Sequence, residues 1–308
     1  MSFDPAVALL FPGQGAHNAA MLDGVLQHHS FSRRYELICA TLGFDPLARI
    51  QEGDAELINT NAVSSLLTVL VSVIGFEQWS KINKAPVALA GYSIGQWTAL
   101  YAAGAITFES LIEAVNQRAA FMDGCFAEHP GAMMAVIGVS PTVLEEFCTQ
   151  LRAEGLDIVI SNYNCYGQYS LAGALNAIET ALSKVSELNP KKAIRVPTSG
   201  AWHSHLLDGA AARLRQYLQE LPVSELRIPV IDNVTGEFLP TCGAALLDRL
   251  AMQVNHPVQW DAGLKTLIAF GCKQFIEVGY GNVLTKFGFF IDRLSVEHKT
   301  FHPAQALI

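Results

Sequence analysis

Residues 86–104 read PVALAGYSIGQWTALYAAG, an apolar run that passes through a glycine-rich turn into a helix-forming segment. Pro86–Ala90 is apolar throughout, which is typical of a strand buried on both faces of a parallel sheet. The turn at residues 91–95 has the pattern G-x-S-x-G, and we expect a helix from Ser93 to Gly104. A buried strand, a tight turn and a helix in this order predict an α/β fold built on a parallel sheet.

Further candidate strands lie towards both ends of the chain. Ala6–Phe11 reads AVALLF before a Pro-Gly-Gln-Gly loop, Gln274–Val278 precedes Gly-Tyr-Gly, and Ile228–Asn233 is a further candidate strand. Residues 61–82 predict a helix. Its apolar run, 62–76, is interrupted by serine and threonine and is shorter than the ~20 residues that span a bilayer. We therefore expect a buried helix and no membrane association.

The middle of the chain, residues 131–197, has a different rhythm. The pattern predicts strands at 132–139, 157–164, 168–172 and 192–196, with helices at 141–153 and 176–188. The order β-α-β-β-α-β is that of a ferredoxin-like unit. We therefore predict a core domain formed by residues 1–128 and 199–308, with a ferredoxin-like small subdomain, 129–198, inserted into it.

Composition narrows the class of protein. The chain has 308 residues, 51% hydrophobic and 16% charged, with a mean hydropathy of +0.28, which excludes a disordered chain. A net charge of −8 without a basic stripe argues against nucleic acid and anionic membranes as partners. Six scattered cysteines without a CxxC pair, and Asp4 where a secretion signal carries positive charge, predict a cytoplasmic protein.

The G-x-S-x-G motif makes Ser93 the candidate nucleophile. The glycines allow a sharp turn, so the hydroxyl stands at a helix N-terminus, where the dipole and free N–H groups favour developing negative charge. A serine at this place can also simply cap the helix. The apolar strand directly before the motif favours the nucleophile.

A serine needs a base, and His203 is the candidate among nine histidines. It lies in the segment GAWHS, 200–204, where the chain leaves the predicted insert, and His205 is its rival. Neither histidine has an acidic or cysteine partner at metal-ligand spacing, and the chain has no P-loop and no dinucleotide G-x-G-x-x-G after a strand. We therefore expect no metal and no cofactor.

These motifs belong to a longer series of blocks over nearly the whole chain, and the series resembles the malonyl-CoA:acyl-carrier-protein transacylase family. The family comprises acyltransferases of fatty-acid and polyketide synthesis, and its fold is an α/β-hydrolase-like core with a ferredoxin-like insert. The matching blocks are Phe11–Gly15, Gly91–Gly95, Arg118–Met122, Ser161–Asn164 with Gly167 and Gln168, Ala201–Ser204, Gln253 with Pro257–Trp260, and Glu277–Gly281.

The resemblance implies a reaction and a role for each matched residue. Ser93 would attack the thioester of malonyl-CoA, which is a substrate rather than a cofactor, with His203 as general base. A backbone carbonyl near Gln253 would orient the histidine. The backbone N–H groups of Gln14 and Ile94 would form the oxyanion hole, and an acyl carrier protein would accept the malonyl group.

The resemblance also implies the substrate-binding residues. Arg118 would bind the malonyl carboxylate, although an arginine on a helix surface paired with Glu113 or Asp123 would give the same local sequence. Trp202, with Ile94, would crowd a branch on the α-carbon and so favour malonyl over branched groups. The remaining substrate-binding residues that we expect are Tyr92, Asn162 and Gln253.

The chain departs from the family pattern at three positions. Tyr92 stands where the elbow usually has histidine, Gln96 where it has glutamate, and Tyr280 where it has proline. With a tyrosine at this position, the elbow resembles that of the transacylase subunit of malonate decarboxylase. This resemblance implies that other subunits of that enzyme would be partners. Two alternatives stay open: a serine hydrolase that uses the same elbow with water as acceptor, and a non-catalytic docking subunit, which Tyr92 and Gln96 suggest.

Overall fold

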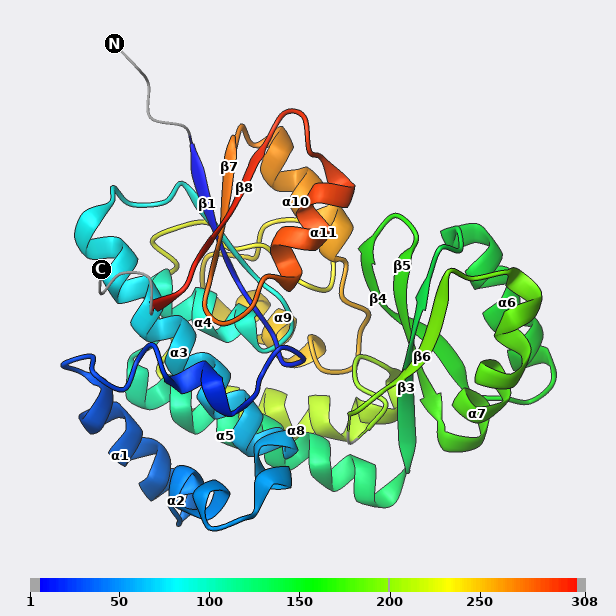
Figure 1. Cartoon of the computed structure of the whole chain (residues 1–308), viewed down its shortest axis with the longest axis horizontal. Helices are drawn as coiled ribbons and strands as arrows, with labels where there is room; N and C mark the ends of the chain where they lie inside the picture. Colours follow the sequence, from blue (N-terminus) through cyan, green and yellow to red (C-terminus); the bar gives the residue numbers. More distant parts are fainter. Residues whose placement is uncertain (1–5, 199, 304–308) are drawn as a thin grey trace.

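The computed structural model describes residues 6–198 and 200–303, and a parallel sheet forms the centre of the core (Figure 1). Its strand order is β2 (Ala88–Gly91), β1 (Val7–Phe11), β7 (Gln274–Val278), β8 (Glu297–Phe301). The first three strands and the parallel α/β class are confirmed. The fourth, β8, was not predicted, because its sequence EHKTF is polar and its side chains are largely exposed.

Helices cover both faces of this sheet. Alternate residues of β1 point to opposite sides, so Leu9 and Phe11 pack in the same cluster as the helices α3 to α5, while Ala8 and Leu10 pack with α10 and α11. The core helices are α1 (Phe31–Leu42), α2 (Pro46–Gln51), α3 (Asn61–Ile82), α4 (Gly95–Ala102), α5 (Phe108–Glu128), α8 (Asp208–Leu218), α9 (Gly243–Met252), α10 (Trp260–Ala269) and α11 (Val283–Ile291).

Helix α3 is the predicted buried helix. By length and composition alone it is long and apolar enough to cross a membrane, but 78% of its most apolar window is buried inside the protein. Its apolar and small polar residues pack against the sheet and against α5. The helix therefore belongs to the core, as the interrupted apolar run indicated.

A second sheet lies beside the core, drawn in green in Figure 1. It is antiparallel, in the order β4-β5-β3-β6, and helices α6 and α7 cover the face turned away from the core. Its elements are β3 (Gly131–Ile137), α6 (Pro141–Ala153), β4 (Ile158–Cys165), β5 (Gln168–Ala174), α7 (Leu175–Lys184) and β6 (Lys192–Val196), in the predicted order. The division into domains at 128/129 and 198/199 stays a prediction, and residue 199 lies outside the described residues.

The predicted strand Ile228–Asn233 is wrong. The segment runs beside β2 but forms only isolated bridges, one of them between Leu89 and Val230. Before the bridged residues, Pro229 has no N–H that could continue the ladder of hydrogen bonds. After them, Asn233 turns its side chain, rather than its main chain, towards the carbonyl of Gly91.

Core and insert are joined next to the elbow. The N–H of Tyr163 donates to the carbonyl of Val258, and the N–H of Val258 donates to the carbonyl of Ser161, at 2.9 and 2.8 Å. These bonds connect β4 to the loop before α10. The insert is thereby held against the edge of the core where β2 ends.

Candidate active site

Ser93 lies at a sharp turn between β2 and α4. A Cβ atom at Gly91 would lie 2.0 Å from the carbonyl carbon of Gly95, and a Cβ at Gly95 would lie 2.1 Å from the carbonyl oxygen of Phe11. Only glycine fits at either position, so the two glycines of the motif have a steric reason. The turn lets the elbow pack directly against the end of β1.

Ser93 and His203 form a hydrogen-bonded pair, 2.7 Å from Oγ to Nε2. Both are buried, and both have a left-handed backbone, with φ of 51° and 61°. Such a conformation costs a residue with a side chain about 1–3 kcal/mol and persists only where the surroundings hold it. Among the described residues other than glycine, only Asn189 shares it. The strain is therefore concentrated on this pair.

The tautomer of His203 follows from its second partner. Its Nδ1 lies 2.8 Å from the carbonyl oxygen of Gln253, which can only accept, so Nδ1 carries the proton and Nε2 offers its lone pair to Ser93. Burial, and then the charge of Arg118, lower the pKa of His203 to about 3. The imidazole is therefore neutral at pH 7 and able to take a proton from Ser93.

The rival histidine is elsewhere. His205 is half exposed and its Nε2 lies 2.9 Å from a carboxylate oxygen of Asp157 on the surface. This bond turns His205 towards the exposed side chain of Asp157 and not towards the elbow. The structure thus favours His203 as the partner of the serine.

Arg118 on α5 points at the same place. Its Nη2 lies 3.4 Å from Ser93 Oγ, its Nε donates to Gln253 Oε1 at 3.3 Å, and its Nη1 is buried without a partner. No carboxylate of the described residues lies within ion-pair distance of it, and Asp123 is instead bonded by Asn61. Burial lowers the pKa of Arg118 to about 10, so it stays charged at pH 7. A buried, charged and incompletely bonded guanidinium is a site for an anion.

The backbone N–H groups of Gln14 and Ile94 have no hydrogen-bond partner among residues 6–198 and 200–303. The side chain of Gln14 donates to Asn61 Oδ1 at 3.0 Å and to Ser64 Oγ at 2.8 Å, which fixes the loop after β1 on α3. Ile94 directly follows Ser93 at the start of α4. Both groups are therefore available to an oxyanion, as the resemblance implied.

A cavity of about 250 Å³ opens onto the serine and the histidine. Trp202 and Asn162 line it, whereas Arg118 and Gln253 are bonded to Ser93 and are not part of its lining. Sequence reasoning did not identify the other polar lining residues. They are His17, Asn59, Ser64, Ser170 and Thr198, which carry no motif of their own.

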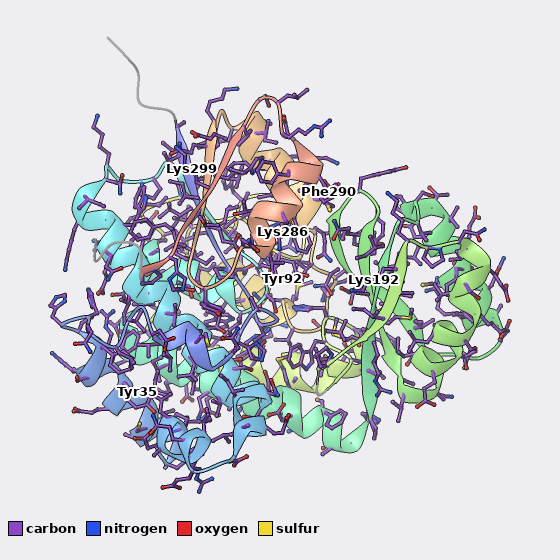
Figure 2. All side chains as sticks on the ribbon, viewed as in Figure 1. Tyr35, Tyr92, Lys192, Lys286, Phe290 and Lys299 are labelled. Atoms are coloured by element: carbon purple, nitrogen blue, oxygen red, sulfur yellow. The ribbon has the colours of Figure 1, made fainter. Side chains whose placement is uncertain are left out.

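Tyr92 separates this cavity from a second one of about 220 Å³, lined by Pro12, Ile137 and Phe287 among others. Figure 2 shows Tyr92 between the core and the sheet of the insert. Its hydroxyl donates to Asn164 Oδ1 at 2.7 Å, and burial raises its pKa, so the phenol stays neutral. The hydroxyl thus ties the elbow to β4, which leaves it no proton for a substrate carboxylate.

The described residues contain no group of three or more His, Cys, Asp or Glu side chains that could hold a metal ion.

Sequence reasoning assigned no site role to two further residues near the elbow, Asn233 and Gln96. The side chain of Asn233 accepts a hydrogen bond from the N–H of Ser93, and the side chain of Gln96 accepts one from the N–H of Asn233. Asn233 was missed because it ended a segment that was predicted to be a strand.

Comparison with known proteins agrees with this geometry. A family model described as "Acyl transferase domain" matches residues 8–288. The malonyl CoA-acyl carrier protein transacylases of Bacillus subtilis and Escherichia coli K12 are 32% and 33% identical, over 91% and 90% of this chain and 88% and 90% of theirs. A solved malonyl-transacylase in complex with its type II polyketide acyl carrier protein superposes with a TM-score of 0.91 at 28% identity, covering 98% of this chain and 97% of that one. The chain belongs to the malonyl-CoA–acyl carrier protein transacylase family and is an acyltransferase.

Proposed function

As a member of this family, we propose, the chain moves a malonyl group from malonyl-CoA to the thiol of an acyl carrier protein through a malonyl ester on Ser93. The observation that carries the proposal is a serine hydroxyl held between a neutral histidine and a charged arginine. The two distances are 2.7 Å from Ser93 Oγ to His203 Nε2 and 3.4 Å to Arg118 Nη2. The pair is a nucleophile with its base, and the arginine suits a substrate that ends in a carboxylate.

The first half-reaction begins when Ser93 Oγ attacks the thioester carbonyl carbon and His203 Nε2 takes the hydroxyl proton. The carbonyl oxygen becomes an oxyanion, which the N–H groups of Gln14 and Ile94 bind. The carbon–sulfur bond then breaks, and His203 gives its proton to the departing CoA thiolate. Losing one oxyanion donor typically costs about 2.7–4 kcal/mol of transition-state stabilisation.

The second half-reaction runs the same steps with a different thiol. The carrier's thiol gives its proton to His203 and attacks the ester carbonyl, and Ser93 leaves with the proton returned to it. The carbonyl of Gln253 keeps the imidazole in the correct tautomer throughout. No acidic side chain is needed in this role.

The two cavities divide the substrate between them. The cavity at Ser93 takes the malonyl group, with its α-carbon against Trp202. The malonyl carboxylate is directed past Ser93 towards Arg118, which does not line the cavity but whose Nη2 lies 3.4 Å from Ser93 Oγ. The adjoining cavity, which shares Gln14 and Tyr92, has apolar walls and the amides of Asn164 and Gln168, and so suits the thiol-bearing arm of CoA or of the carrier.

The conditions of the reaction complete the proposal. The CoA thioester is a substrate, and the reaction needs no metal and no further cofactor. All six cysteines are free thiols, which accords with work in the reducing cytoplasm.

Two types of carrier protein could accept the malonyl group in this reaction. Tyrosine at position 92 is the feature that favours a malonate decarboxylase carrier over a fatty-acid or polyketide carrier. The test offers labelled malonyl-CoA with each type of carrier and measures label on carrier and label released to water. Transfer to a carrier at least tenfold faster than release to water supports the transferase, whereas equal rates with and without carrier would establish the hydrolase.

A further inference from the structure

One side chain from a distant segment holds the main chain on both sides of Tyr92. The Nδ2 group of Asn233 donates to the carbonyl of Gly91, and the N–H of Ser93 donates to Asn233 Oδ1, both at 2.7 Å. In a regular parallel sheet the next strand would make such bonds with its own main chain. Here a side-chain amide replaces the strand at the position where β2 turns into the elbow.

Asn233 is itself held by two further bonds. Its N–H donates to Gln96 Oε1 at 2.9 Å, and its carbonyl accepts from the N–H of Gln259 at 2.7 Å. The residue is 2% exposed. The orientation of its amide is also fixed, since Ser93 offers only a donor and Gly91 only an acceptor. The backbone N–H and carbonyl and both side-chain polar groups of Asn233 are thus hydrogen-bonded, which fixes the position of its side chain.

The two side-chain bonds of Asn233 to Gly91 and Ser93, which we call the clamp, act on a residue whose backbone is strained. Ser93 has a left-handed φ of 51°, and a serine leaves that conformation unless its neighbours hold it. Asn233 holds its N–H, while Gln253 Nε2 donates to its carbonyl at 2.7 Å. The side-chain amides of Asn233 and Gln253 therefore bond to the N–H and the carbonyl of Ser93, respectively.

We propose that Asn233 is a positioning residue for the nucleophile. Its side-chain amide keeps Ser93 in the left-handed conformation that places Oγ on His203 Nε2, and it leaves the N–H of Ile94 free for the oxyanion. Gln96 supports it by accepting the N–H of Asn233. The inference rests on the proposed role of Ser93 in the reaction.

This role predicts a particular kinetic effect. Asn233 lines neither cavity, so binding of malonyl-CoA should survive its loss while formation of the ester slows. For Asn233→Ala we expect kcat for malonyl transfer to fall about 100-fold, which is ~2.7 kcal/mol, with KM for malonyl-CoA within about threefold of the wild type. A residue with a merely structural role would change the folded fraction and not the kcat of the folded enzyme.

The conservative variant supplies a second readout. In Asn233→Asp the ionised carboxylate can accept from Ser93 but faces the carbonyl of Gly91 with a second acceptor, whereas the protonated acid can donate to it as the amide does. We therefore expect kcat of Asn233→Asp to recover as the pH falls from about 8 to about 5.5. His203 stays neutral over that range, because its pKa lies at about 3.

The experiment measures kcat, KM and thermal unfolding for the two Asn233 variants, with Ile38→Ala as control. Ile38 is fully buried on α1, away from the elbow, so its variant loses stability without touching the clamp. A 100-fold loss of kcat in folded Asn233→Ala, absent from Ile38→Ala, supports the proposal. A kcat within threefold of the wild type, or a loss that disappears on correction for folded enzyme, would overturn it.

Ser93→Ala separates this inference from the function on which it rests. If Ser93→Ala is inactive and Asn233→Ala is normal, only the positioning role is wrong. If Ser93→Ala still transfers malonyl groups, the proposed route through a malonyl ester on Ser93 is itself wrong.

Discussion

The two sides of the active site are built in different ways. On the core side, Ser93, His203, Arg118 and Gln253 are buried and connected by hydrogen bonds, and two of them have strained backbones. On the insert side, Asn162 and Ser170 of the antiparallel sheet line the cavity, and the side chain of Asn162 is hydrogen-bonded within the insert. The core therefore holds the reacting atoms rigidly, whereas the insert sets the shape of the space in front of them.

This difference predicts that changes to Ser93 and His203 reduce the rate with every substrate, whereas changes to Arg118 and to the cavity wall alter the choice of substrate. The largest effect is expected for Ser93→Ala and for His203→Ala. Each should lower kcat by about 10⁴-fold, since a nucleophile and its base act as one unit. Steady-state transfer from malonyl-CoA to a carrier measures it. A double variant no slower than either single variant is the matching control, and multiplying losses would break the assignment.

The next effect concerns Arg118. Hydrogen bonds to a charged group contribute about 1.5–3 kcal/mol, so Arg118→Ala should reduce kcat/KM for malonyl-CoA by roughly 100-fold. Use of acetyl-CoA, which has no carboxylate, should change far less. Arg213→Ala, which removes an exposed arginine 3.6 Å from Glu128, serves as the control and should change neither. Equal losses with both substrates would make Arg118 a structural residue.

A smaller effect is expected on the cavity wall. Trp202→Ala should raise the ratio of methylmalonyl to malonyl transfer about tenfold, because a pocket discriminates a single methyl group by about 1–3 kcal/mol. Competition between the two CoA esters measures the ratio directly. An unchanged ratio in an active variant would mean that Trp202 does not contact the α-carbon.

The smallest effect is expected for the bond between core and insert. Tyr92→Phe keeps the ring next to Trp260, 5.5 Å between centroids, and removes only the hydroxyl that bonds to Asn164. We expect a loss of about 1 kcal/mol in the free energy of unfolding and a kcat within about twofold.

Tyr163→Phe is the matched control for that variant, since the Tyr163 hydroxyl bonds to Glu145, which also lies within the insert. It should change neither stability nor kcat measurably. A fall in kcat of Tyr92→Phe as large as that of Arg118→Ala would instead give the phenol a part in the chemistry.

The sequence predicted those parts of the fold that have a local pattern. The strands β1 and β2 are apolar runs, β7 is a short strand that precedes Gly-Tyr-Gly, and the insert shows its six elements in order. The polar edge strand β8 lacked such a run. The segment 228–233 had the run but makes only isolated bridges, because Pro229 and the side chain of Asn233 interrupt the ladder.

The candidate site was predicted to a similar degree. Ser93 and His203 stand in recognisable local segments, and the resemblance supplied Arg118, Gln14 and Ile94. Asn233 could not be predicted, because its contact with Ser93 joins positions 140 residues apart and depends on how one segment lies beside β2. The bond between Tyr92 and Asn164 likewise depends on how the insert packs against the core.

The central claim is that Ser93 carries the malonyl group between two thiols. The most direct measurement mixes the enzyme with malonyl-CoA, quenches it, and locates the added mass by peptide mapping, before and after addition of a carrier. We expect one malonyl group on the peptide that contains Ser93, and we expect it to disappear as the carrier gains it. A malonyl group on another residue, or an enzyme that transfers malonyl without ever carrying it, would contradict the account.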